Sequence, residues 1–158
     1  MGKILKAAGA ILATVIGAVI VFYLTSPGGL LNPPKKPVAD LYIADTELLK
    51  AHVGHGAEMR FKVYNGGDAD ALGCAVYWES SEEFSQRYEA STLDPNTSYR
   101  FTLSERFDLG AGETYLVTST SLPYEQSGHK YSRAAVGCSN TFNYDVQSHE
   151  TIVDFDMK

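Results

Sequence analysis

The chain opens on an unbroken apolar run over residues 7–24 that contains no charged side chain. Its 18 residues reach the lower limit for a helix that crosses a bilayer core of roughly 30 Å, and the run has no polar face. No small-x-small cleavage pattern follows it, so we interpret residues 1–24 as an uncleaved signal anchor. Lys3 and Lys6 before the run favour a single-pass topology in the cell membrane with an extracytoplasmic C-terminal part, although Lys35 and Lys36 dilute this bias.

Small residues recur at every fourth position inside the run, at Gly9, Ala13 and Gly17. Such a stripe allows two helix backbones to approach closely in lipid. It predicts that the anchor associates with itself, which would make the protein a homo-oligomer.

Residues 25–37 separate the anchor from the remainder of the chain. They include four prolines and two glycines, which cannot continue a helix. We expect a short, partly stiff stalk. Residues 38–158 then have a length that suits one domain with a single core, and we call this segment the head.

The pattern in the head changes to period two, because apolar and polar residues alternate in short runs bounded by turn residues. Leu72, Cys74, Val76 and Trp78, for example, fall on one face of a strand. Strands are predicted over residues 41–44, 59–64, 71–78, 99–104, 114–119, 133–139 and 151–156. This pattern predicts an all-β, Ig-like antiparallel β-sandwich of about seven strands behind one N-terminal transmembrane α-helix. A short helix or long loop is expected over 80–90, and a loop over 123–130.

The two cysteines lie on faces that we expect to point into the core. Cys74 shares its face with Trp78, and Cys138 shares its face with Ala134 and Val136, on a middle and a late strand that could oppose each other. An even cysteine count and an oxidising outer compartment favour a disulfide, which we predict. Two reduced core cysteines are the alternative.

Charge is distributed unevenly along the chain. The net charge is −6, but four of the 13 basic residues and none of the 19 acidic residues lie in residues 1–36. The head therefore combines nine basic with 19 acidic residues, for a net charge of −10. Nucleic-acid binding requires basic surface that neutralises phosphates, so nucleic acid is excluded as a partner.

Two groups of side chains have the composition of metal sites. His52, His55 and Glu58 could supply zinc ligands, although a solvated glycine-rich turn explains their spacing equally well. A second group could offer calcium its oxygen atoms, but it matches ordinary turn chemistry and lacks the EF-hand pattern; it consists of Asn65, Asp68 and Asp70. We predict no cofactor and no metal, with calcium as the alternative for the second group.

The motifs of catalysis are absent from the sequence. It contains no G-x-S-x-G elbow, no P-loop and no G-x-G-x-x-G, and both cysteines fit core positions, so we predict that the protein is not an enzyme. Asn96 begins an N-glycosylation sequon on a predicted turn. Tyrosines that could be partly exposed offer contacts to protein or sugar; they are Tyr64, Tyr77, Tyr88, Tyr124, Tyr131 and Tyr144.

Three stretches of the head resemble the Ig-like, cell-adhesion-related modules known as CARDB domains. They are ADLYIADTEL (39–48), VGHGAEMRFKVYNGGDADA (53–71) and LDPNTSYRFTLS (93–104). Asn96 stands where these modules usually have a glycine. The resemblance implies an Ig-like sandwich with a surface role, and it implies no catalytic residues.

A second resemblance is to archaeal type IV pilins, which join an N-terminal apolar helix to an Ig-like head. Lys6-Ala7-Ala8 is similar to the processing site of such subunits. The proline-rich stalk departs from a long filament helix. We therefore expect a membrane-anchored, extracytoplasmic and non-catalytic module that mediates protein or envelope interactions. The alternatives are a subunit of a pilus-like filament and a metal-dependent accessory protein or enzyme.

Overall fold

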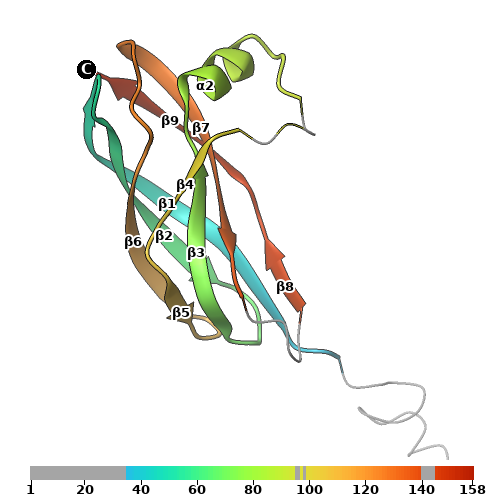
Figure 1. Cartoon of the computed structure of the whole chain (residues 1–158). Coiled ribbons are helices and arrows are strands. Elements are labelled where there is room, and N and C mark those ends of the chain that lie inside the picture. Colours follow the sequence, from blue (N-terminus) through green and yellow to red (C-terminus); the bar gives the residue numbers. More distant parts are fainter. Residues whose placement is uncertain (1–34, 95–96, 98, 140–144) are drawn as a thin grey trace, which may run out of the picture. The chain divides into compact units, whose positions relative to one another are not determined.

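The head forms two β-sheets that face each other (Figure 1). The computed structural model describes residues 35–94, 97, 99–139 and 145–158, and its compact unit runs from Pro37 to Lys158. The first sheet has the order β6-β2-β1-β8, with β1 Val38–His52, β2 Gly56–Asn65, β6 Thr114–Thr120 and β8 Asp145–Ser148. The second sheet has the order β4-β3-β7-β9, and β5 also pairs with β3; the bounds are β3 Ala71–Glu79, β4 Phe101–Leu103, β5 Phe107–Leu109, β7 Gly128–Gly137 and β9 Thr151–Met157.

The predicted all-β sandwich is confirmed, with differences in detail. The described residues contain nine strands rather than about seven, because β5 and β8 are too short to show a periodic pattern. β8 pairs with the start of β1 in parallel, whereas every other pair is antiparallel as predicted. β7 begins at Gly128, inside the loop that we expected over 123–130. The segment 80–90 contains helix α2, Glu82–Glu89, which Ser81 caps by accepting a hydrogen bond from Phe84 N.

The core fills the space between the sheets with the side chains that alternate inward. Trp78 from the second sheet packs edge to face on Phe61 from the first, with ring centroids 5.3 Å apart. Phe155 on β9 also packs edge to face with Trp78, with ring centroids 6.2 Å apart. The indole N–H of Trp78 donates to Ser132 Oγ at 2.8 Å, so the buried ring leaves no polar atom unpaired. Aromatic packing of this kind joins the two sheets.

The strand β3 contains a bulge that reverses the predicted face of Leu72. The pairing of β3 with β5 shifts register between Ala71 and Cys74, and Gly73 adopts a φ of +60° that favours glycine. Ala71 is consequently buried and Leu72 is 45% exposed, so the prediction that Leu72 points into the core is wrong. A Cβ on Gly73 would also collide with the side chain of Ser139.

The predicted disulfide between Cys74 and Cys138 is present. It joins neighbouring strands of one sheet, because Cys74 and Cys138 follow directly on the Ala75–Gly137 pair of β3 and β7. The bond therefore lies within one sheet. In antibody domains, by contrast, the disulfide joins the two opposing sheets. Cys74 is fully buried, and the bond closes a loop of 64 residues.

A buried polar cluster holds α2 to one end of the sandwich. Lys130 Nζ donates to Glu82 Oε1 at 2.7 Å and lies 5.7 Å from the centroid of the Tyr124 ring. The Tyr124 hydroxyl lies 3.2 Å from Ser80 Oγ. Tyr124 is fully buried, so the expectation that it is partly exposed is wrong.

Tyr124 gives the fold a predicted dependence on alkaline pH. Burial raises the pKa of the phenol from 10.0 to about 12, against a smaller opposite effect of the Ser80 hydrogen bond. Because the folded pKa is raised, this contribution to stability is complete below pH 10 and is lost as pH rises through about 12. We expect the free energy of unfolding to fall by about 2–3 kcal/mol over that interval.

Urea unfolding at pH 9 to 12 tests this expectation. Tyr124→Phe should flatten the fall, whereas Tyr77→Phe, which changes an exposed phenol, should leave it intact. An equal fall in the Tyr124→Phe variant would contradict the assignment.

Several predicted features lie outside the described residues. They are the transmembrane helix with Gly9, Ala13 and Gly17, most of the stalk, the sequon asparagine Asn96, and Tyr144. Among the residues that the structure describes, no helix is long and apolar enough to span a bilayer.

Candidate functional site

The zinc candidates lie at the turn between β1 and β2. His52 ends β1 and His55 lies in the turn, where its amide donates to the carbonyl of His52; both side chains are exposed. Glu58 on β2 forms an ion pair with Lys50 at 3.6 Å. Across the described part of the chain, no three His, Cys, Asp or Glu side chains gather as a metal ion would require.

The first calcium candidate, Asn65, is a buried hydrogen-bond centre at the end of β2. Its Oδ1 accepts from the amides of Asp40 at 3.2 Å and Gly67 at 3.1 Å. Its Nδ2 donates to the carbonyls of Ala69 at 2.8 Å and of Leu109 and Gly110 at 3.3 Å each. The side chain is fully buried, and it ties the β2–β3 turn to β1 and to the β5–β6 turn.

The other two calcium candidates bind backbone amides near the same turn. Asp68 Oδ1 accepts from Val38 N at 2.7 Å, and Asp70 Oδ1 accepts from Ala111 N at 3.1 Å. The structure thus brings Asn65, Asp68 and Asp70 to one end of the sandwich, with their oxygens directed at the chain itself. These hydrogen bonds to backbone groups account for the sequence NGGDAD at residues 65–70 as that of a β-strand turn.

The outward side of the second sheet carries an apolar surface. Strand pairing sets Tyr77 beside Leu103 and beside Ala135, and it sets Phe101 beside Glu79. Tyr77 is 42% exposed, Phe101 46% and Leu103 54%. We call this surface the outer face, and it consists of Tyr77, Glu79, Phe101, Leu103, Arg133, Ala135, Glu150 and Ile152.

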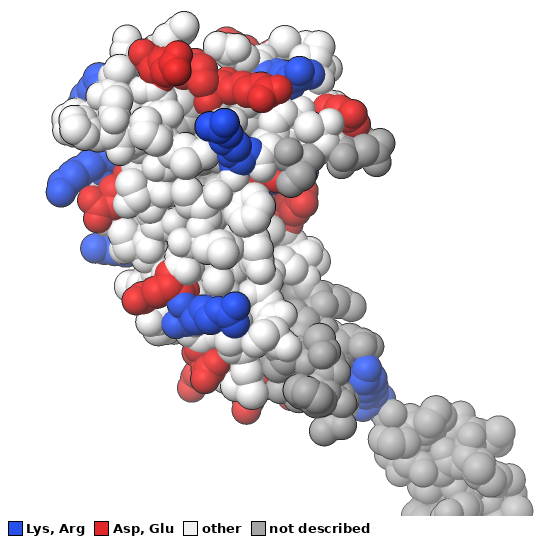
Figure 2. Space-filling model, in the orientation of Figure 1, with Lys and Arg blue, Asp and Glu red and all other residues white. Residues whose placement is uncertain are grey.

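The first sheet presents a different surface to solvent. Its outward side carries ion pairs, such as Arg60 Nη1 to Glu47 Oε2 at 2.8 Å, and a row of threonines on β6. In the view of Figure 2, acidic side chains lie at both ends of the head with basic side chains beside them, whereas the middle is mostly uncharged. Monomeric proteins rarely leave a contiguous apolar patch exposed without a use for it, so the outer face is the candidate binding surface.

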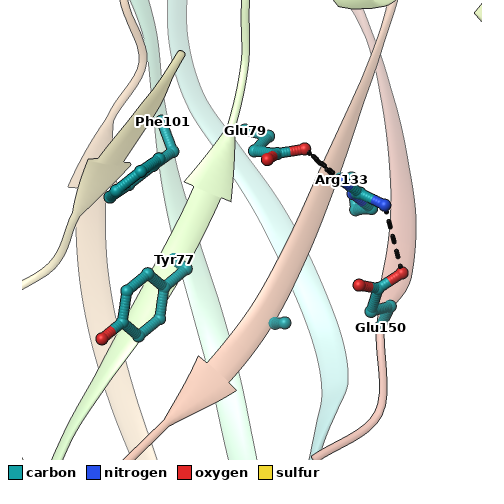
Figure 3. Close-up of a pocket in the computed structure, with 6 residues that line it drawn as sticks. Tyr77, Glu79, Phe101, Arg133 and Glu150 are labelled. Atoms are coloured by element: carbon teal, nitrogen blue, oxygen red, sulfur yellow. Dashed lines mark hydrogen bonds and ion pairs between the residues drawn. The ribbon is translucent and has the colours of Figure 1, made fainter. Parts of the chain in front are cut away.

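A hollow of about 240 Å³ lies within the outer face. The rings of Tyr77 and Phe101, 5.8 Å apart, form one wall, and the small side chain of Ala135 contributes to the lining. Glu79 and Arg133 line the opposite side (Figure 3). The hollow thus combines aromatic surface with charged hydrogen-bonding groups.

Arg133 links two carboxylates across the edge of the hollow. Its Nε donates to Glu79 Oε2 at 3.0 Å, and its Nη1 lies 3.4 Å from Glu150 Oε2. Partial burial is the largest single influence on the pKa of the Arg133 guanidinium and lowers it, but the hydrogen bonds and charges of Glu79 and Glu150 together raise it. The guanidinium of Arg133 therefore stays charged between the two glutamates.

Gly137 makes room for the Tyr77 ring, because a Cβ at this position would collide with the ring. We expect Gly137→Ala to displace the ring from the hollow and to reduce the free energy of unfolding by less than about 1 kcal/mol, since an exposed side chain can rotate away. NMR spectra of the aromatic protons measure both the displacement and the fold. Gly66→Ala is the control, because its Cβ would meet Tyr42 and Tyr64 instead. Unchanged Tyr77 signals in Gly137→Ala would refute this packing.

Sequence reasoning identified Tyr77 as a candidate for exposure but missed its neighbours. The alternation of residues 99–104 places Phe101 and Leu103 on one face, without indicating which face is the core. Glu150 was missed because it follows β8, a strand without a periodic signal. An exposed apolar pair on a three-residue edge strand has no distinct sequence signature.

Comparison with known proteins does not assign the chain to a protein family. No model of a protein family matches the chain, and no curated protein matches it. A crystal structure of a selenomethionine-labelled β-glucosidase from Kluyveromyces marxianus resembles it with a TM-score of 0.33 and 14% identity. The match covers 75% of this chain and 15% of that chain, and similarity at this level carries no functional argument.

Proposed function

We propose that the head is an Ig-like, non-catalytic binding module that recognises a protein or envelope partner through its outer face. The observation that carries this proposal is the exposed apolar surface around Tyr77, Phe101 and Leu103, with a hollow at its centre. Aromatic and arginine side chains are the residues that most often dominate the energy of protein interfaces. The charged groups that line the hollow pair with one another, so a partner that covers the surface would bury no isolated charge.

The strand order supports the Ig-like part of the proposal. Strands β1, β2 and β6 occupy the places of strands A, B and E in an Ig sheet, and β3, β7 and β9 those of C, F and G. β4 adds an edge strand beside β3. We retain the resemblance to CARDB modules, which rests on the stretches 39–48, 53–71 and 93–104 of the sequence, as part of the proposal.

We further propose that residues 1–24 anchor the protein in the cell membrane and that the stalk 25–37 holds the head outside it. The apolar run supports the anchor. The Cys74–Cys138 disulfide supports an oxidising compartment for the head, since disulfides form and persist there.

Lysine substitution on the outer face tests the binding function. In membranes from the native host, chemical crosslinking of the full chain should yield adducts with a partner, and Leu103→Lys should reduce their yield at least fivefold. The matched control is Val53→Lys, which alters an apolar residue that is 38% exposed at the β1–β2 turn. Equal adduct yields in both variants would refute the outer face as the binding surface.

A further inference from the structure

Strand β6 is an open edge of the first sheet. Within the part of the chain that the structure describes, β6 pairs only with β2, and this pairing runs without interruption from Thr114–Tyr64 to Thr120–Glu58. Its sequence TYLVTST contains no charged residue, no proline and no glycine. Leu116 in its middle is 58% exposed. Threonine, tyrosine, valine and leucine in an uninterrupted register form a template for pairing with another strand.

The other described edges carry the devices that prevent such pairing. β4, β5 and β8 are three or four residues long. Beyond its contact with β8, β1 has register shifts after Ile43 and after Leu48, and it carries charged residues between them. β9 presents Asp154 and Asp156 to solvent. Short length, bulges and charge all block edge-to-edge association, and β6 has none of them.

We propose that β6 pairs antiparallel with β6 of a second copy of this chain, so that the first sheets of the two heads form one continuous sheet. The pair is isologous about Val117, which lies opposite its own counterpart. Leu116 then lies opposite Thr118 of the second copy, and Thr114 opposite Thr120. Cross-strand pairs of this composition stabilise a sheet.

Two properties of the molecule favour a second copy as the occupant. The β6 edge is uncharged in a head whose net charge is −10, so two copies meet there with less repulsion than anywhere on their charged surface. The register also places Tyr115 of the second copy opposite Ser119, whose buried hydroxyl has no hydrogen-bond partner in the described part of the chain.

Cysteine crosslinking of the full chain in detergent micelles tests the pairing. Both native cysteines are in the disulfide, so an introduced thiol is the only free one. A mixture of the Leu116→Cys and Thr118→Cys variants should form a disulfide-linked dimer under mild oxidation at least fivefold more than Leu103→Cys does. A yield no higher than that of Leu103→Cys would overturn the proposal.

Sedimentation of the same full chain separates this contact from association through the anchor or the outer face. Leu116→Lys combined with Thr118→Lys sets lysine opposite lysine in both cross-strand pairs, and it should raise the dimer dissociation constant at least tenfold. Leu103→Lys should leave the constant unchanged. A monomer at all concentrations, or a dimer that resists the double lysine variant, would overturn β6 pairing while leaving the proposed function of the outer face intact.

Discussion

Replacing Asn65 with alanine is expected to lower the free energy of unfolding of the head by about 3–5 kcal/mol. The substitution removes the Oδ1 that accepts from the amides of Asp40 and Gly67, and the Nδ2 that donates to three carbonyls. Asn65 itself is fully buried, and its hydrogen bonds to the carbonyls of Ala69 and Leu109 are buried with it. An unpaired backbone group in such a place costs about 1–3 kcal/mol, and several are created at once.

Urea unfolding of the compact unit Pro37–Lys158 measures this loss. Asn65→Asp keeps the shape of the side chain but puts an acceptor oxygen in place of the Nδ2 donor. The three carbonyls then lose their donor, so this variant should also destabilise the head. Gln86→Ala is the control, because Gln86 lies exposed on α2 and its amide makes only a 3.5 Å contact with Glu82. A loss below about 1 kcal/mol for Asn65→Ala would contradict the assigned role.

Removing the disulfide by Cys74→Ala with Cys138→Ala is expected to cost about 4 kcal/mol. The bond closes a loop of 64 residues, and the chain-entropy relation assigns this value to a loop of that length. We expect the variant to keep its fold, because the sheets are joined by core packing and the bond links two strands that already pair with each other.

Thermal and urea unfolding, with the oxidised and the reduced wild-type head in parallel, measure the contribution of the bond. The reduced wild type should match the double alanine variant apart from the small change in side-chain volume. A difference of less than about 1 kcal/mol between oxidised and reduced heads would show that the loop is constrained without the bond.

Two of the strands with clear alternation were predicted from the sequence almost to the residue, whereas β1, β4 and β7 differ from their predicted bounds by several residues. The predicted strands 114–119 and 151–156 correspond to β6 Thr114–Thr120 and β9 Thr151–Met157. Both have one face in the core and one in solvent, which is the condition under which period two appears. The cysteine pair was also predictable, because both residues follow the core-facing alternation of long strands.

The candidate binding surface could not be predicted, because it depends on register and on contacts between distant segments. Alternation shows that Phe101 and Leu103 share a face, but pairing with β3 decides that this face points outward. Tyr99 just before β4 turns inward instead and packs edge to face on Phe84 of α2, at 5.4 Å. The bulge at Gly73 likewise exposes Leu72 through a local backbone conformation. Such reversals leave no trace in the spacing of apolar residues.

Photocrosslinking in native membranes tests the proposed binding function most directly. A photoreactive residue replaces Phe101 on the outer face in one full-length variant and Thr46, on β1 of the other sheet, in the second. We predict discrete adducts from position 101 and at most a background level from position 46. Equal labelling at the two positions, or no adduct from position 101, would contradict the account.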